Sequence, residues 1–155
     1  MNIIGKSPIN PIIFYSGKIA GYAIWIALLM KLIDAHVVGR LNPLKSLALL
    51  LILFSLIIIV TSLVNLGAST RLGLPDENTE FKTDGIYKFS RNPMYLGFNM
   101  LSIAAILYLH NPVVLILGLY SIFTYHLIIC AEEDFLENRF NVKYQEYKRK
   151  VRRYI

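Results

Sequence analysis

The chain has 155 residues, of which 55% are hydrophobic and 17% are charged, and its mean hydropathy is +0.52. Ordinary soluble domains have a smaller apolar fraction, so these values indicate a small polytopic membrane protein. The net charge is +6. Because the basic residues flank apolar segments, they favour anionic headgroups over nucleic acid as partners. With Cys130 as the one cysteine, an internal disulfide is excluded.

Two long apolar segments occupy the first half of the chain. Residues 12–33 and residues 44–66 both reach the roughly 20 residues that an α-helix needs to cross a bilayer. Lys18 and Lys31 stand near the ends of the first segment, where long side chains can extend to the headgroups. We therefore expect two transmembrane helices within residues 1–66.

A polar loop, residues 67–92, separates these two spans from two more. Residues 93–109 and 112–131 are apolar and are joined by a tight turn, so we expect an antiparallel helical hairpin. Pro93 suits the first turn of the third helix, with Asn92 as its N-cap. No polar loop follows the fourth span, so its helix is expected to continue out of the membrane.

The C-terminal segment, residues 132–155, has the periodicity of an amphipathic helix. Its apolar residues recur every three or four positions, and they are Leu136, Phe140, Tyr144, Tyr147, Val151 and Tyr154. We expect this helix to lie at the membrane surface or to cover the bundle as a lid. The predicted fold is all-α: a polytopic membrane helical bundle of about four transmembrane helices with a C-terminal amphipathic helix.

The distribution of Lys and Arg predicts the orientation. With four spans, both termini and the 67–92 loop share one side, which carries twelve of these cations, whereas the other side carries three. Because cytoplasmic loops are enriched in Lys and Arg, both termini and the loop are predicted to be cytoplasmic. The protein is thus predicted to be a multi-pass integral membrane protein.

Common cofactor and metal motifs are missing. The glycines form neither G-x-G-x-x-G nor G-x-x-x-x-G-K-[ST], so the usual phosphate-binding loops are absent from the sequence. His126, Cys130 and Glu133 share one region of a helix and are a conceivable metal face. Structural zinc sites use a tighter ligand set, so we favour a helix whose small polar groups pack inside the bundle and predict no metal.

The segment 83–97, which reads TDGIYKFSRNPMYLG, is a short polar segment between apolar spans. Hydrogen-bond donors for a carboxylate or phosphate, and flat apolar rings, lie in it or beside it: Lys82, Arg91, Asn92 and Tyr95, with Phe81 and Tyr87. Such a composition is typical of a small-ligand site. It equally fits a juxtamembrane loop whose cations meet headgroups and whose aromatics form an interfacial belt.

Glu132 and Glu133 stand at the end of the fourth span. Carboxylates at membrane depth are costly and therefore face protein or water. Helical neighbours point about 100° apart, so the two cannot serve the same purpose. Glu132 lies four residues before Leu136 on the apolar face, and we expect it to enter a pocket and suit a cationic ligand. Glu133, with Asp134 and Glu137, is expected on a solvated face that pairs with cations of the tail.

Two segments together resemble a known family. GIYKFSRNPMYLG and, one hairpin later, EEDFLENRFNVKYQEYKRKVRR resemble the membrane methyltransferases of the isoprenylcysteine carboxyl methyltransferase family, which are related to phospholipid methyltransferases. The matching residues are Gly85, Tyr87, Arg91, Asn92, Pro93, Tyr95, Gly97, Glu132, Glu133, Leu136, Phe140, Tyr144 and Tyr147. The resemblance covers roughly residues 67–155, and the first two spans match only as generic hydrophobic helices.

The resemblance implies an integral membrane methyltransferase that uses S-adenosylmethionine and a lipophilic acceptor such as an isoprenylcysteine-like carboxylate. It implies a cytoplasm-facing cofactor pocket under the loop and the C-terminal helix. The implied cofactor contacts are Thr79, Glu80, Phe81, Lys82, Tyr87, Asn92, Pro93, Met94, Tyr95 and Glu132, and the implied catalytic residues are Glu132 and Arg91. Thr79–Lys82 follows from spacing to Tyr87. Residues 1–155 then form a single domain, with a cofactor-binding core at 67–155.

Two departures and three alternatives accompany this interpretation. Asn92 stands where many members have His, which removes a titratable group, and Asn141 stands where Gly is usual. Asn tolerates a left-handed backbone, so the turn at Asn141 is expected to survive. The alternatives are a phospholipid headgroup N-methyltransferase, an NADPH-dependent membrane reductase of the sterol reductase type, and a membrane scaffold without enzymatic activity.

Overall fold

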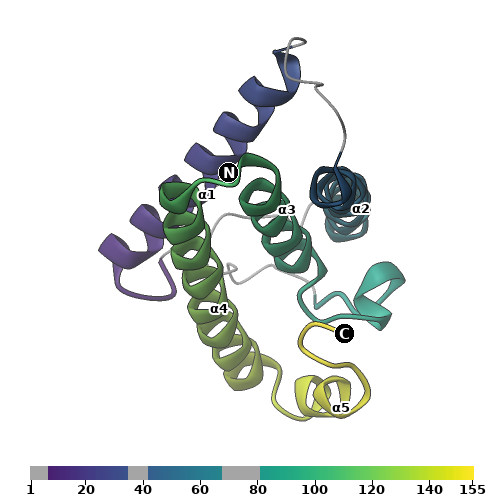
Figure 1. The fold of residues 1–155 in the computed structure, drawn as a ribbon. Coiled ribbons are helices and arrows are strands. Elements are labelled where there is room, and N and C mark those ends of the chain that lie inside the picture. The colour runs from purple at the N-terminus through teal and green to yellow at the C-terminus, as the bar shows by residue number, and fades with distance from the viewer. Residues whose placement is uncertain (1–6, 35–41, 68–80) are drawn as a thin grey trace.

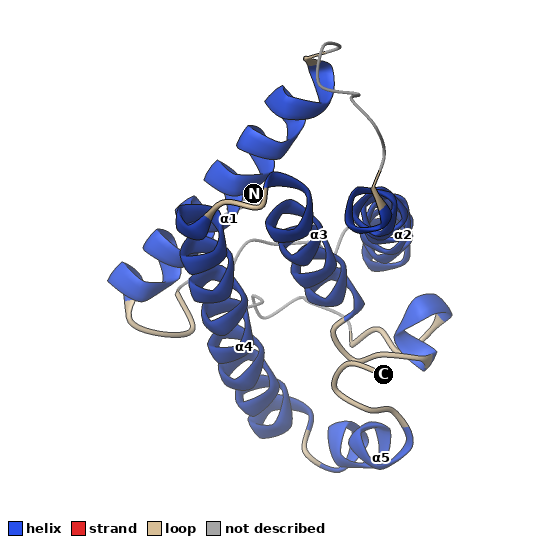
Figure 2. Ribbon diagram, in the orientation of Figure 1, coloured by secondary structure: helices blue, strands red, loops and turns tan. Residues whose placement is uncertain are grey.

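In the computed structural model, residues 7–34, 42–67 and 81–155 are described, and in these ranges every regular element is a helix (Figures 1 and 2). The elements are α1 (Pro11–Ile33), α2 (Pro43–Leu66), the short 3₁₀ helix η3 (Gly85–Lys88), α3 (Pro93–Leu109), α4 (Pro112–Phe140) and α5 (Val142–Lys150). The all-α prediction is confirmed, and the four expected spans match α1 to α4 to within a residue at each start.

Three of these helices, α1, α2 and α4, are long and apolar enough to cross a membrane. The fourth apolar helix, α3, has 17 residues and is about 25 Å long at 1.5 Å per residue. Large apolar side chains on the outside of the bundle, such as Leu53, Val64 and Ile116, are more than half exposed. Side chains of this kind, exposed all along the long helices, suit a lipid environment better than water.

All four long helices begin with an Asn-Pro step, and this step explains where they start. Proline fits the first helical turn because it has no N–H to leave unpaired. The side chains of Asn10, Asn42 and Asn111 accept hydrogen bonds from the backbone N–H groups of the first turn. Asn92 occupies the same position before α3, but its side chain makes no cap hydrogen bond. The cap predicted for Asn92 is therefore wrong, and its amide is used elsewhere.

The helices pair as α2 with α3 and α1 with α4, and α3 also contacts α1 and α4. In Figure 1, α3 lies between α2 and α4. Gly17 and Gly21, four residues apart on α1, allow Thr124 and Ser121 of α4 to approach so closely that an added Cβ would overlap them. Small residues at this spacing bring membrane helices into close backbone contact. They hold the first half of α1 against the first half of α4.

The segment after the fourth span departs from the single long helix suggested by its periodicity. α4 continues to Phe140, as expected, but Asn141 has a φ of +44° and breaks the helix before α5. After α5 the chain is extended from Val151 onward. The expectation that Asn141 preserves the turn is confirmed. The apolar stripe nevertheless stays together, because Tyr144, Tyr147 and Val151 form a buried cluster.

The break directs the C-terminal residues back across the start of α3. The backbone N–H of Arg91 donates to the carbonyl of Arg152 at 3.0 Å, and the buried hydroxyl of Ser90 donates to the carbonyl of Arg153 at 3.3 Å. In Figure 1 the C-terminus accordingly lies beside the start of α3. The segment between η3 and α3 is thus enclosed by α4 on one side and, on another, by residues 151–155, which we call the C-terminal tail.

Candidate active site

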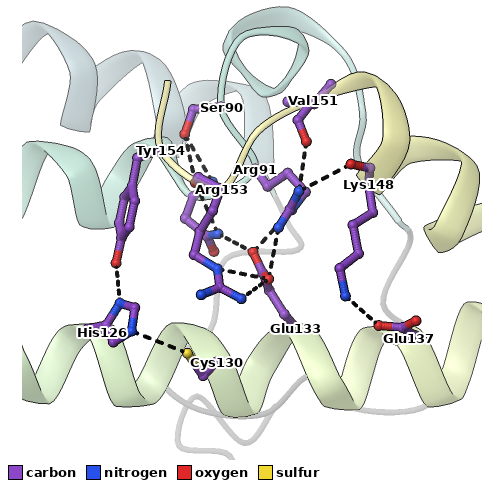
Figure 3. Close-up of polar contacts among 11 residues, drawn as sticks. Ser90, Arg91, His126, Cys130, Glu133, Glu137, Lys148, Val151, Arg153 and Tyr154 are labelled. Atoms are coloured by element: carbon purple, nitrogen blue, oxygen red, sulfur yellow. Dashed lines mark hydrogen bonds and ion pairs between the residues drawn. The ribbon is translucent and has the colours of Figure 1, made fainter.

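The carboxylate of Glu133 is the hub of a buried polar cluster (Figure 3). Arg91 donates to it through Nε at 3.1 Å and Nη2 at 2.9 Å. Arg153 donates through Nε at 3.1 Å and Nη2 at 3.0 Å, and the amide of Asn92 donates at 2.8 Å. Glu133 is 2% exposed. Five charge-assisted hydrogen bonds satisfy the buried carboxylate and join three parts of the chain.

Arg91 uses its remaining donor to hold the tail. Its Nη1 donates to the carbonyls of Val151 at 2.7 Å and Lys148 at 3.4 Å. The Asn92 amide likewise donates to the carbonyl of Arg153 at 3.3 Å. The donors of Arg91 are therefore directed to Glu133 and to the tail rather than to open space. The role predicted for Arg91 in catalysis stays a prediction. In the structure, Arg91 joins α4 to the C-terminal tail.

The expectation that Glu133 lies on a solvated helix face is wrong. It does pair with a cation of the tail, Arg153, but the carboxylate is buried because the tail folds back over α4 and leaves only the arginine partly exposed. Glu137, one turn further along, matches the expected pattern: it pairs with Lys148 at 2.8 Å in a partly exposed position. Helical spacing alone does not distinguish Glu133 from Glu137, since both lie on the same side of α4 in Figure 3.

Glu132 points elsewhere and has a different partner. The hydroxyl of Tyr95, which is 8% exposed, donates to its carboxylate at 2.8 Å. Tyr95 belongs to a buried cluster with Phe14, Tyr125 and Ile128. Among the described residues, no cation forms an ion pair with Glu132. This carboxylate therefore lies against an aromatic cluster with most of its hydrogen-bonding capacity unused, unlike Glu133.

Aromatic residues of η3, α5 and the segments beside them form a cluster next to the polar hub. The hydroxyl of Tyr147 donates to the backbone carbonyl of Tyr87 at 2.6 Å. Phe81 contacts the rings of Phe140, Tyr144 and Tyr147. Burial raises the pKa of Tyr87 to about 12, and the negative charge of Glu132 adds to the effect. Tyr87 therefore lies in an apolar environment within electrostatic range of Glu132.

The structure places the predicted site residues unevenly. Four of them lie together at the start of α3: Arg91, Asn92, Pro93 and Tyr95. Asn92 is bonded to Glu133 of α4, and Tyr95 is bonded to Glu132. Met94 packs against the cluster that contains Tyr95. Phe81 lies in the aromatic cluster with Tyr144 and Tyr147 of α5. Thr79 and Glu80 lie outside the described residues.

Residues that the sequence did not predict as site residues also enter the region. The backbone and guanidinium of Arg153 hold the loop from the tail, and the hydroxyl of Tyr154 lies 2.7 Å from Nδ1 of His126. Cys130 contacts the other nitrogen of His126 at 3.7 Å. The His126, Cys130 and Glu133 side chains thus have protein partners, and the described residues contain no group of three or more His, Cys, Asp or Glu able to hold a metal ion.

Comparisons with known proteins agree on one group of enzymes. Residues 44–143, well over half of the chain, match the family model "Phospholipid methyltransferase". A curated relative is the protein-S-isoprenylcysteine O-methyltransferase of Saccharomyces cerevisiae, 38% identical over 68 residues, which cover 43% of this chain and 28% of the yeast protein. No solved structure matches. The matched region contains α3, α4 and nearly all of α2, with Arg91, Asn92 and Glu133 of the polar cluster. The chain belongs to the phospholipid methyltransferase family.

Proposed function

We propose that the protein is an integral membrane methyltransferase that transfers a methyl group from S-adenosylmethionine to a lipophilic acceptor carrying a carboxylate, such as an isoprenylcysteine-like molecule. Enzymes of this family and of the related isoprenylcysteine methyltransferases use S-adenosylmethionine. The observation that carries the proposal is the carboxylate of Glu132, which Tyr95 holds against an aromatic cluster without a cation in ion-pair contact among the described residues.

The residues around Glu132 fit this cofactor. Its amino-acid end has a positively charged ammonium group, and a carboxylate in low-dielectric surroundings needs such a charge to offset its desolvation. The hydroxyl of Tyr125, in the same cluster, is buried without a hydrogen-bond partner among the described residues. The rings of Tyr95, Phe98 and Tyr125 offer flat surfaces close by. In this proposal Glu132 holds the ammonium, and the aromatic rings exclude water.

The chain needs no strong acid or base for the proposed reaction. When bound, S-adenosylmethionine supplies a methyl group on a positively charged sulfur, and transfer to a carboxylate oxygen leaves two neutral products without moving a proton. Glu133, Arg91 and Arg153 fix the start of α3, so that Tyr95 and Glu132 keep their positions. Apolar walls strengthen the attraction between the reacting charges. The contribution of the protein is therefore alignment and exclusion of water.

Asn92 supports a carboxylate acceptor over an amine. A phospholipid headgroup amine must lose a proton before or during methylation, whereas a carboxylate is already anionic. Asn92 cannot accept that proton, and its amide is bound to Glu133. The yeast relative is named for methylation of S-isoprenylcysteine, which agrees with this choice. The family model supports the second candidate, a phospholipid headgroup N-methyltransferase.

We further propose that both termini and the loop before α3 face the cytoplasm, as the distribution of cations predicts. Five cations in α5 and the tail support this orientation: Lys143, Lys148, Arg149, Lys150 and Arg152 are exposed. A membrane-impermeant label on single cysteines placed near Ile155 or near His110, in a chain with Cys130→Ser, tests it in intact vesicles. Equal labelling at both positions contradicts the orientation.

Two measurements test the function. Calorimetric titration of the detergent-purified protein with S-adenosylhomocysteine and with NADPH separates a methyltransferase from a reductase, and binding of NADPH alone overturns the proposal. Incubation with radiolabelled S-adenosylmethionine and either a farnesylcysteine derivative or phosphatidylethanolamine vesicles then identifies the acceptor. A labelled product that releases methanol in base is a methyl ester and supports the carboxylate. A base-stable product supports the headgroup amine instead.

A further inference from the structure

Lys18 is a cation inside the membrane-length helix α1, seven residues beyond its start at Pro11. Its ammonium lies 3.9 Å from the centre of the Phe14 ring. Phe14 is 4% exposed and belongs to the buried cluster that contains Tyr95 and Tyr125. The long side chain is thus directed along α1 toward that cluster, rather than outward to lipid.

This position brings Lys18 near Glu132. Phe14 lies below the ammonium, Tyr95 packs in the same cluster as Phe14, and the Tyr95 hydroxyl is bonded to Glu132. The ammonium and the carboxylate attract each other, but no ion pair joins these two described residues. Charges at membrane depth are costly and usually have a partner. Here two opposite charges lie against the same aromatic cluster without an ion pair between them.

Arg91 is a poor candidate for binding a ligand carboxylate. Its guanidinium is 7% exposed and donates to Glu133 and to two carbonyls of the tail. Recruiting it would break the cluster that holds the loop to α4. Arg153 is bound to the same carboxylate. Among the cations whose contacts connect them to the cluster around Glu132, Lys18 has an aromatic ring and no carboxylate as its close partner.

We propose that Lys18 of α1 binds the carboxylate of the cofactor's amino-acid end, while Glu132 of α4 binds its ammonium. This inference rests on the proposed function. An α-amino acid group carries one charge of each sign on one carbon, which matches an ammonium and a carboxylate that contact one aromatic cluster and are not paired with each other. It assigns a cofactor contact to a helix that precedes the family match at residues 44–143. It also makes the close α1–α4 contact at Gly17 and Gly21 a requirement of the site.

The arrangement explains why a lysine is present at this depth. Lys18 stabilises no ion pair among the described residues. Within that part of the chain its charge is offset by the Phe14 ring and by the attraction of Glu132. A cation–π contact is worth about 0.5–2 kcal/mol, which is small against the cost of a charge in a membrane helix. A bound carboxylate supplies the missing compensation. Lys31, near the other end of α1, is exposed and has no such surroundings.

Two ligands that differ by a single carboxylate test the proposal. S-adenosylhomocysteine has both charged groups, and its decarboxylated analogue, S-adenosyl-3-thiopropylamine, retains only the ammonium. Calorimetry on the full-length protein in detergent measures both dissociation constants. We expect the wild type to prefer S-adenosylhomocysteine by tenfold or more and Lys18→Met to bind both ligands equally. Lys18→Arg keeps the charge and is expected to keep the preference.

The matched controls are Lys31→Met, which removes a cation from the same helix, and Glu132→Gln, which removes the proposed ammonium partner. Lys31→Met is expected to retain the wild-type preference. Glu132→Gln is expected to weaken the binding of both ligands to the same extent, because both have the ammonium group. A preference that survives in Lys18→Met overturns the assignment of Lys18 while leaving the methyltransferase proposal intact. Absence of S-adenosylhomocysteine binding to the wild type overturns both.

Discussion

The hydroxyl of Tyr95 donates to Glu132 at 2.8 Å, and the next residue of α4, Glu133, binds Arg91 and Asn92. Two consecutive carboxylates therefore hold opposite ends of one five-residue segment at the start of α3. Among the described residues, Glu133 is saturated by five donors, whereas Glu132 has one. This difference in saturation separates a carboxylate that stabilises the fold from one that is available to a ligand.

Glu132→Gln and Glu133→Gln are expected to have different effects. Glu132→Gln removes charge from the ligand region, so S-adenosylhomocysteine affinity should fall by tenfold or more with little change in melting temperature. Glu133→Gln leaves the buried guanidinium of Arg91 without its counter-charge. Because breaking a buried pair costs about 3–5 kcal/mol, its melting temperature should fall markedly. Thermal unfolding in detergent and calorimetry measure the two effects. Asp134→Asn, at an exposed position of the same helix, is the control, and equal melting temperatures for both Gln variants contradict the division.

Tyr95→Phe tests whether the hydroxyl orients Glu132. The substitution keeps the ring and its packing but removes the hydrogen bond to the carboxylate, and bonds to charged groups contribute about 1.5–3 kcal/mol. We expect weaker S-adenosylhomocysteine binding and no further loss when Tyr95→Phe is combined with Glu132→Gln. Fully additive losses in affinity would show that the two side chains act independently.

Gly85→Ala is expected to destabilise the loop for two separable reasons. Gly85 has a φ of +61°, and an added Cβ would overlap the side-chain amide of Asn65 on α2. The left-handed backbone costs a residue with a Cβ about 1–2 kcal/mol. Gly67→Ala measures the backbone part alone, because Gly67 has a φ of +54° with nothing within 4 Å of the added atom.

The steric part at Gly85 is measured by a second substitution. Gly85→Ala should lower the melting temperature more than Gly67→Ala, and adding Asn65→Ala should reduce that excess. If Gly85→Ala and Gly67→Ala give equal shifts, the contact between the loop and α2 is not restrictive.

Stability should fall at high pH because tyrosines outside the spans are buried. The pKa of Tyr87 is raised from its ordinary value near 10 to about 12, so the folded protein binds a proton more strongly than the unfolded chain. The stabilisation is present below pH 10 and is lost as the pH rises toward 12. Burial also raises the pKa of Tyr147. Chemical unfolding between pH 9 and 12 should show this decline, less steeply in Tyr87→Phe. An unchanged slope in that variant contradicts burial of the hydroxyl.

The sequence alone predicted most of the secondary structure. Apolar runs of span length and Asn-Pro steps give the starts of α1 to α4, because hydrophobic length and proline chemistry are local properties. The Asn141 turn followed from the tolerance of asparagine for positive φ. The same local rule failed at Asn92, whose amide is bound to Glu133 instead of capping α3. Such a failure is expected where a residue has a tertiary role.

Only the tertiary structure decided the environment of each charge. Periodicity placed Glu133 with Glu137 on a solvated face, but the tail returns over α4 and buries Glu133 beneath Arg153, 20 residues later in the chain. The direction of Lys18 toward the cluster around Tyr95 follows from the close packing of Gly17 and Gly21 on α4. The sequence determined which residues carry charge and where helices begin. Burial depends on which distant segments fold together, and the spacing along one helix contains no record of that.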